Sequence, residues 1–320
     1  MRRLLLISNG NAYRTTAYQR EVIPRALAAE FKVDVAVTTR PGDATLLARQ
    51  AALDGIAIVA ALGGDGTVNE VANGLAGTDS SLAILPAGMA NVFARSLGIP
   101  DDPIEATGWL VENPDISPRR VPLGRVADRY FTVSCGVGLD AAVVREVERR
   151  QWTKKRLGDW LFVWSGLRVF FRGYDRRKPR IGVAWGPGAE ERRERLFLAI
   201  AQNTTPYTYF RGRAMRLCPD AELDGGLDLL ALDSLRTRVA IPVVARAFRS
   251  ARHIRGRHAL YLKDRRRFDL RCDRPMPVQV DGEFIGLHER LAIESVPAAL
   301  GVLFPANLLA RGIGRGSGRP

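Results

Sequence analysis

The chain has 320 residues, of which 46% are hydrophobic, and its 48 Lys and Arg against 34 Asp and Glu give a net charge of 48 − 34 = +14. This charge favours anionic partners such as phosphates, an acidic membrane surface or nucleic acid, although an arginine-rich composition alone would produce it too. Three scattered cysteines exclude a disulfide framework or a zinc site of familiar spacing. No run of about 18 apolar residues occurs, which excludes a membrane-spanning helix.

Strand-like and helix-like segments alternate through the first third of the chain. The expected strands are residues 4–8, 33–38, 56–62 and 82–85, and the expected helices are residues 18–30, 43–53, 67–75 and 90–97. Such alternation predicts a parallel sheet covered by helices, with ligands bound beyond the carboxyl ends of the strands. The loops expected to converge there are residues 9–11, 38–42, 63–67 and 87–91.

Beyond residue 118 the pattern changes to short strands with intervening turns. The expected strands are residues 119–126, 130–137, 180–185, 196–202, 227–233, 259–262, 267–272 and 277–280. Close spacing of this kind predicts an antiparallel sandwich, here interrupted by two helical insertions at residues 140–171 and 236–255.

The length of the chain and this change of pattern predict two domains. The first is expected to comprise residues 1–118, with residues 297–312 packing back on it, and the second residues 119–296. Residues 313–320 are expected to form a flexible tail.

The stretch around Asp65 carries the strongest functional signal. Residues 56–62 form an unbroken apolar run, Gly63, Gly64, Asp65 and Gly66 follow, and Thr67 opens a helical pattern. A strand, a glycine turn and a helix N-terminus together make an anion site, because backbone N–H groups point at the ligand and glycines allow a phosphate to approach. A plain turn also uses glycine, but three glycines around an aspartate exceed that need. Neither the P-loop pattern nor the dinucleotide fingerprint GxGxxG fits the stretch.

Three blocks resemble the diacylglycerol kinase catalytic-domain family, which includes sphingosine kinases and bacterial YegS-like lipid kinases. Residues 63–71, GGDGTVNEV, are similar to the family's GGDGTxNEV, of which NAD kinases share GGDGT. Residues 85–95, LPAGMANVFAR, resemble LPxGTxNDFAR, and residues 280–283, VDGE, resemble the family's late DGE. The resemblance implies an α/β N-terminal domain with a parallel, NAD-kinase-like sheet, and a mainly antiparallel β-sandwich C-terminal domain with helical insertions.

The same resemblance implies an ATP- and Mg²⁺-dependent lipid kinase that phosphorylates a hydroxyl of a diacylglycerol-like or sphingoid-like membrane lipid. The residues that align with nucleotide-binding positions are Asn9, Thr38 (with Thr39 as the alternative), Gly63, Gly64, Asp65, Gly66, Thr67, Val68, Asn69, Glu70, Met89 and Asn91. Met89 replaces the usual threonine, and its thioether accepts hydrogen bonds only weakly. This departure leaves open an altered nucleotide affinity or a loss of activity.

Carboxylates complete the implied machinery. By resemblance, Asp65 would hold the catalytic Mg²⁺ on the ATP phosphates, and Glu283, or otherwise Asp281, would accept the proton of the lipid hydroxyl. Relatives also place a structural Mg²⁺ at the turn following residue 218. Here its ligands would be the Asp224 side chain and the carbonyls of Ala221 and Gly226, although an acidic turn without metal stays open.

The insertion at residues 140–171 interleaves aromatic and cationic residues, which suits a membrane interface or the mouth of a lipid-accepting cleft. A helix with buried aromatics and solvated arginines explains it equally well. No nucleic-acid-binding motif accompanies the charge, so we expect no nucleic-acid partner. The N-terminal apolar run is too short for a signal peptide.

We therefore expect a cytoplasmic protein that meets the anionic inner face of the membrane peripherally, and a homodimer stays open. Two alternatives to a lipid kinase also stay open. One is an NAD kinase, and the other is a catalytically idle nucleotide- or lipid-binding protein.

Overall fold

The computed structural model describes residues 1–10, 16–149 and 159–305, with side chains in the last range from Trp164 on. The predicted loop 9–11 and insertion 140–171 lie partly outside the described residues, and the predicted tail 313–320 lies wholly outside them. The chain divides into two compact units. Among the described residues, one unit contains residues 1–121 and 298–305, and the other contains residues 122–297.

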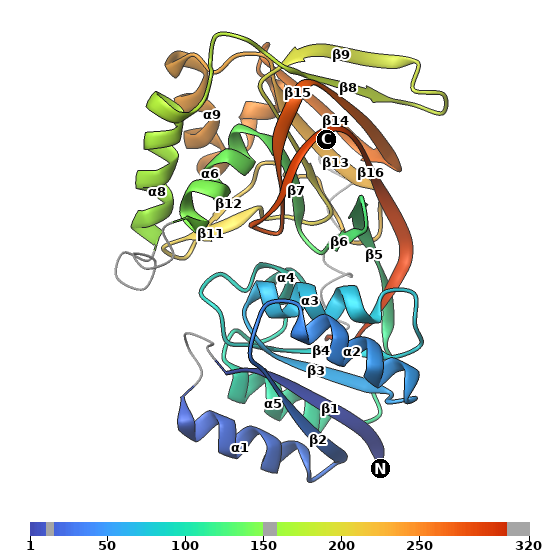
Figure 1. The fold of residues 1–320 in the computed structure, drawn as a ribbon. Helices are drawn as coiled ribbons and strands as arrows, with labels where there is room; N and C mark the ends of the chain where they lie inside the picture. Colours follow the sequence, from blue (N-terminus) through green and yellow to red (C-terminus); the bar gives the residue numbers. More distant parts are fainter. Residues whose placement is uncertain (11–15, 150–158, 306–320) are drawn as a thin grey trace, which may run out of the picture. The chain divides into compact units, whose positions relative to one another are not determined.

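A parallel sheet forms the centre of the first unit (Figure 1). Its strands are β1 (Arg2–Asn9), β2 (Phe31–Thr38), β3 (Ile58–Gly63) and β4 (Ser81–Pro86), in the order β4-β3-β1-β2. Gly301 and Val302, from the end of β16 (Glu283–Val302), add a further parallel pairing beside β4. Every residue of β3 and β4 is buried, as expected for strands that are covered on both faces.

Helices cover both faces of this sheet. In the described part of the unit they are α1 (Ala17–Leu27), α2 (Asp43–Leu53), α3 (Asp65–Leu75), α4 (Val92–Ser96) and α5 (Pro103–Glu112). Helix α2 packs against α3, and α1 packs against α5. Figure 1 shows the two pairs on opposite faces of the sheet. Such an arrangement leaves the carboxyl edge of the strands to the loops, as the sequence predicts.

Two boundaries near the glycine turn differ from the sequence prediction. Strand β3 begins at Ile58 rather than Ile56, because the Ile56 amide donates to the Ala51 carbonyl and closes the end of α2. Helix α3 begins at Asp65 rather than Thr67. A carboxylate in the first turn of a helix interacts favourably with the helix dipole, which explains the earlier start.

The second unit is built on an antiparallel sheet in the order β14-β13-β10-β7-β15-β16. Its strands besides β16 are β7 (Ser134–Gly138), β10 (Leu198–Gln202), β13 (Leu227–Leu232), β14 (Ala259–Arg265) and β15 (Arg267–Val280). Further pairs are β5 (Arg119–Val126) with β6 (Arg129–Phe131), β8 (Ile181–Trp185) with β15 and with β9 (Glu191–Leu196), and β11 (Thr208–Phe210) with β12 (Arg213–Met215).

Alternate residues of β10 and β13 face two different hydrophobic cores. Ala199 and Ala201 belong to a core closed by other strands, in which Phe131 and Phe268 are also buried. Leu198, Ile200 and their neighbours on β13 belong to a second core, which helices cover. The antiparallel sandwich expected for this part of the chain is therefore confirmed.

The helical insertions of this unit are α6 (Leu139–Glu148), α8 (Asp159–Arg168) with a short π-helix η1 (Val169–Gly173), and α9 (Thr237–Arg249) with a 3-10 turn η2 (Arg252–Arg255). The predicted insertion at residues 236–255 is thus helical and consists of α9 and the turn η2. Within the ranges that the structure describes, none of the helices could cross a bilayer.

Three strand predictions need correction. The predicted runs 267–272 and 277–280 are one strand, β15, whose register against β16 shifts between Arg271 and Met276. The predicted run 130–137 is two strands, because the amides of Thr132 and Val133 bond to a side chain instead of a neighbouring strand. Strands β9, β11 and β12 were not predicted. In β9, five successive exposed charged residues obscure the alternating pattern of a strand.

Candidate functional site

Two predicted loops of the first unit meet at the carboxyl edge of its sheet. Gly63 and Pro86 are partners in the register of β3 and β4, and the Ala87 amide donates to the Gly63 carbonyl at 2.8 Å. Beyond them the backbones touch, because a Cβ added to Gly88 would lie 2.6 Å from the Cα of Gly64. The fold therefore requires glycine at this contact.

Polar side chains fix the second loop in place. Asp65 accepts a hydrogen bond at 2.7 Å from the backbone N–H of Val92, the first residue of α4. Asn91 is buried in a left-handed conformation (φ 45°), and its side chain both accepts from the Gly88 amide and donates to the Gly88 carbonyl. Asp65 and Asn91 thus hold residues 87–91 against the glycine turn.

The carboxyl ends of β1 and β2 contribute the next predicted residues. The Asn9 side-chain amide donates to the hydroxyl of Thr67 at 3.2 Å, and Asn9 is also the sheet partner of Thr38. The hydroxyl of Thr39 donates to Asp43, the first residue of α2. Because Thr39 is engaged in this way, Thr38 remains the better candidate for a nucleotide contact.

The remaining residues predicted on α3 contact the protein itself. Glu70 accepts a hydrogen bond from the Ala44 amide through its carboxylate, at 3.1 Å. Asn69 is buried and bonded to Asn73, and Val68 is buried as well. These interactions give the three residues a part in packing α3 against its surroundings. A role for them in nucleotide binding stays a prediction.

Gly66 differs from the neighbouring glycines. It lies in the first turn of α3, is exposed, and a Cβ added to it would meet no atom within 4 Å. Alanine would suit such a helical position better, so the fold alone does not explain the glycine. Met89, on the adjoining loop, is also exposed. The first turn of α3 is therefore a candidate anion site, because a helix N-terminus presents backbone N–H groups, and the adjoining loop carries the Met89 thioether.

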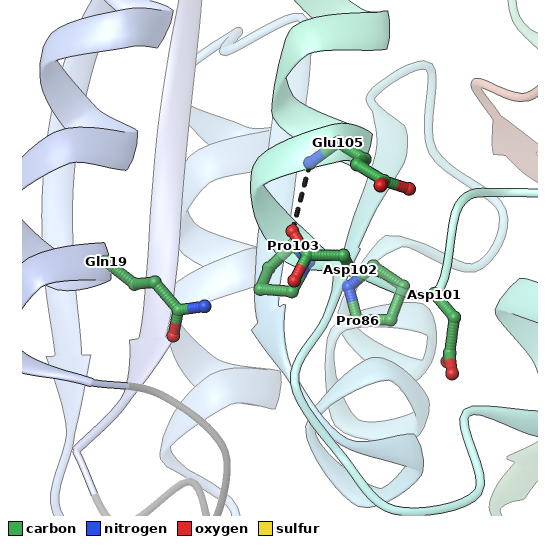
Figure 2. Close-up of a pocket in the computed structure, with 6 residues that line it drawn as sticks. All are labelled: Gln19, Pro86, Asp101, Asp102, Pro103 and Glu105. Carbon is green, nitrogen blue, oxygen red and sulfur yellow. Dashed lines mark hydrogen bonds between the residues drawn. The ribbon is translucent and has the colours of Figure 1, made fainter.

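A pocket of about 320 Å³ lies beside the end of β4 (Figure 2). It is lined by Gln19, Pro86, Asp101, Asp102, Pro103 and Glu105. Asp102 caps α5 by accepting from the amides of Ile104 and Glu105, and Asp101 pairs with Arg95. Because three carboxylates line this pocket, the glycine turn is the better place for a phosphate.

In the second unit, the turn between β15 and β16 contains the two predicted acids. Asp281 accepts four hydrogen bonds of 2.7–2.9 Å, from the hydroxyl and amide of Thr132 and from the amides of Val133 and Ser134. Its backbone is left-handed (φ 46°), as is that of Gly282 (φ 83°). Asp281 therefore anchors the turn to the strands that precede it.

Glu283 lies on the surface of the same turn. Its side chain is 50% exposed and pairs with Arg129 at 2.7 Å. The next amide, of Phe284, donates to Glu148 on α6 at 2.8 Å. Of the two predicted acids, Glu283 is the exposed one, and its role as a base stays a prediction.

A network of hydrogen bonds next to this turn was not predicted from the sequence. The side chain of Gln279 accepts from the Gly282 amide and donates to Asp140, which also accepts from the hydroxyl of Tyr207. Burial raises the pKa of the Asp140 carboxyl, and the two hydrogen bonds oppose that rise. Since Asp140 and Gln279 are 139 residues apart, only the folded chain shows their contact.

The predicted metal turn is tied to β14. The Gly226 amide donates to Asp264 at 2.6 Å, Ala221 is buried and the Asp224 side chain is exposed. In the described ranges no three His, Cys, Asp or Glu side chains are placed to share a metal. The Asp224 carboxylate is an oxygen donor of the type that Mg²⁺ binds, but backbone carbonyls and water would have to complete the coordination of the ion. A metal at this turn stays a prediction.

Comparisons with known proteins cover both units. Residues 3–124 match the diacylglycerol kinase catalytic domain, and residues 133–304 match the YegS C-terminal NAD kinase beta sandwich-like domain. The chain is 30% identical over 292 residues to a diacylglycerol kinase of Bacillus subtilis (strain 168), which covers 90% of this chain and 91% of that protein. It is 35% identical over 226 residues to a protein of Chromohalobacter salexigens named "Probable lipid kinase YegS-like" (69% and 68% covered).

A solved structure shares the fold. The crystal structure of a diacylglycerol kinase from Bacillus anthracis str. Sterne superposes with a TM-score of 0.70 at 19% identity, covering 96% of this chain and 98% of that one. These findings confirm the predicted fold class, a parallel α/β part followed by an antiparallel sandwich with helical insertions, and they bear out the resemblance on which the site residues were assigned.

Proposed function

Because the chain belongs to the diacylglycerol kinase catalytic-domain family, we propose that it is an ATP- and Mg²⁺-dependent lipid kinase. It would transfer the γ-phosphoryl group of ATP to a hydroxyl of a diacylglycerol-like or sphingoid-like membrane lipid. The observation that carries this proposal is Gly66 in the first turn of α3, where an added Cβ would meet no atom and the fold does not need glycine, at a helix N-terminus of the kind that binds phosphates.

The first unit would bind the nucleotide. The N–H groups at the start of α3 would receive ATP phosphates, and the Asn9–Thr67 hydrogen bond would keep the neighbouring strand end in place. Asp65 offers a single carboxylate, which fits Mg²⁺, since this ion is usually held by one or two carboxylates together with substrate phosphates. Bound there, Mg²⁺ would neutralise charge on the phosphates.

The second unit would supply the base. A lipid hydroxyl is a poor nucleophile near neutral pH, so a carboxylate that takes its proton assists attack. Glu283 would accept that proton while the lipid oxygen bonds to the γ-phosphorus and the bond to the β–γ bridging oxygen breaks, which releases ADP. Arg129 would hold the Glu283 side chain in place through their ion pair.

A transfer assay tests the proposal. Purified full-length protein is incubated with Mg²⁺, ATP labelled at the γ position and vesicles of mixed lipid classes, and the lipids are separated. We expect one labelled lipid class, and its loss in Asp65→Asn. Asp54→Asn, a change of the same kind at an exposed site at the end of α2, serves as the control. If no lipid class becomes labelled, the lipid kinase proposal is wrong.

Two observations favour functions other than that of a lipid kinase. The second unit matches an NAD kinase-like sandwich domain, so the same preparation is assayed for NADP formed from NAD and ATP. Formation of NADP without labelled lipid would favour an NAD kinase. The exposed Met89 in place of the usual threonine favours an idle binding protein, and nucleotide binding without any turnover would point to that outcome.

A further inference from the structure

Most of the large apolar side chains that are exposed in the second unit lie on one layer of helices. In the described part of this unit, the exposed large apolar side chains on α8, η1 and α9 are Trp164, Leu167, Phe171, Ile241 and Val244, and only Leu287 lies elsewhere. Both helical segments cover the same face of the sheet, because Phe170 of η1 and Val243 of α9 pack against one core cluster. We call residues 164–173 and 237–249 the helical layer.

The helical layer is strongly cationic. Residues 237–249 contain three arginines and no acidic residue, and the flanking residues 236 and 250–257 add four arginines and no acidic residue. Residues 164–173 contain two arginines, of which Arg168 pairs with Glu146, and no acidic residue. Residues 174–178 follow with three cations and one acid, Asp175, which pairs with Arg180. The guanidinium of Arg176 lies 4.4 Å from the ring centre of Phe170 and 5.4 Å from that of Phe171. Exposed aromatic and aliphatic side chains therefore stand among positive charges.

We propose that the helical layer docks on an anionic phospholipid bilayer. Trp164, Phe171 and their aliphatic neighbours would enter the headgroup region, and the arginines would pair with lipid phosphates. A second copy of the chain is a poor occupant, because it would bring like charges together. Nucleic acid would leave the aliphatic side chains exposed. A lipid surface of negative charge satisfies the charge and the apolar surface together.

Helix α6 connects this layer to the turn that carries Glu283. Glu146 of α6 pairs with Arg168 of α8 at 3.2 Å, and Glu148 accepts a hydrogen bond from the Phe284 amide at 2.8 Å. Arg145, on the same helix, lies over the Phe284 ring. Docking through the helical layer would thus act on the part of the molecule proposed to receive the lipid hydroxyl. The inference rests on the proposed function, because a kinase that acts on a membrane lipid has a use for docking. Docking itself needs no nucleotide.

Vesicle sedimentation without nucleotide tests the docking surface. Full-length protein is mixed with phosphatidylcholine vesicles, with and without phosphatidylglycerol, and the bound fraction is measured. We expect binding that requires phosphatidylglycerol. The double variant Arg238→Ala/Arg249→Ala should bind roughly 30-fold more weakly, at about a factor of five for each arginine near the surface. Matched Arg192→Ala, exposed on β9 of the same unit, should bind as the wild type does.

The apolar part needs its own variants. Leu167→Ser/Ile241→Ser should reduce binding at least about tenfold, while Leu287→Ser should not change it. Brominated lipid should quench Trp164 fluorescence, and the part of the quenching lost in Trp164→Phe reports its insertion. Because all these positions are exposed, their variants should melt like the wild type.

Several outcomes would overturn the proposal. They are equal binding of neutral and anionic vesicles, variants of the helical layer that bind like their controls, or a dimer in gel filtration that the same variants dissociate. Docking with no labelled lipid in the transfer assay would instead refute the proposed function and leave the docking surface standing.

Discussion

Substitution of Gly66 by alanine separates what the fold needs from what a ligand needs. Gly66 lies in the first turn of α3, and an added Cβ meets no atom within 4 Å. Alanine at such a helical position should stabilise the protein by about 0.5–1 kcal/mol, because it restricts the unfolded chain and favours the helix. For a domain of about 150 residues this corresponds to a rise in melting temperature of about 1–4 °C.

Gly88→Ala is the matched comparison, because its Cβ would lie 2.6 Å from the Cα of Gly64 and 2.7 Å from the side-chain oxygen of Asn91. Since a backbone atom cannot yield as a flexible side chain does, the two loops must separate. Overpacking of this kind costs about 1–3 kcal/mol. The two alanine variants should therefore change the melting temperature in opposite directions.

Thermal melting and a nucleotide titration together decide the case. We expect Gly66→Ala to melt above the wild type and still to bind ATP at least about tenfold more weakly, because the methyl group lies where a phosphate would approach the N–H groups. The reasoning is refuted if Gly66→Ala binds ATP like the wild type. It is also refuted if this variant melts below the wild type, since the fold would then need the glycine.

The other predictions concern single side chains. Glu283→Gln should abolish lipid phosphorylation while nucleotide binding, followed by titration, is retained. Asp281→Asn should lower the free energy of unfolding by about 2–4 kcal/mol in urea denaturation, because an amide cannot accept all four hydrogen bonds. Hydrogen bonds from Thr39 hold the pKa of Asp43 at about 2, below its usual 3.8, so its stabilising contribution is present above pH 3.8 and is lost as the pH falls towards 2; the difference in melting temperature between wild type and Asp43→Ala should vanish over that range. Met89→Thr should tighten nucleotide binding, and an unchanged dissociation constant would show that the thioether is not near the nucleotide.

The sequence was most informative where the signal is local. The run from Ile58 to Leu75 places a buried strand, a turn and a helix within 18 consecutive residues, and each is visible from its own residues. The loop around Met89 could be added by resemblance. The fold then brought these loops together as a parallel sheet requires, because its carboxyl ends share one edge.

Contacts between distant residues could not be predicted. The four hydrogen bonds to Asp281 come from residues almost 150 positions earlier in the chain, and the link from Gln279 to Asp140 is equally remote. No local pattern in the sequence indicates which distant residues form such contacts. Strand β9 shows a second limit, because an edge strand covered in charges lacks the alternating pattern by which strands are recognised.

The chemistry of the carboxylate explains why two acids of one turn should have different functions. A carboxylate has about four lone-pair sites for hydrogen-bond donors. Asp281 uses four of them on Thr132, Val133 and Ser134, so a lipid hydroxyl would have to displace a donor that holds the turn. Glu283 has Arg129 as its ion-pair partner and is half exposed, which leaves room for a hydroxyl to donate. A base must accept a proton at the moment of attack, and for this reason we propose Glu283 as the base and a structural part in the turn for Asp281.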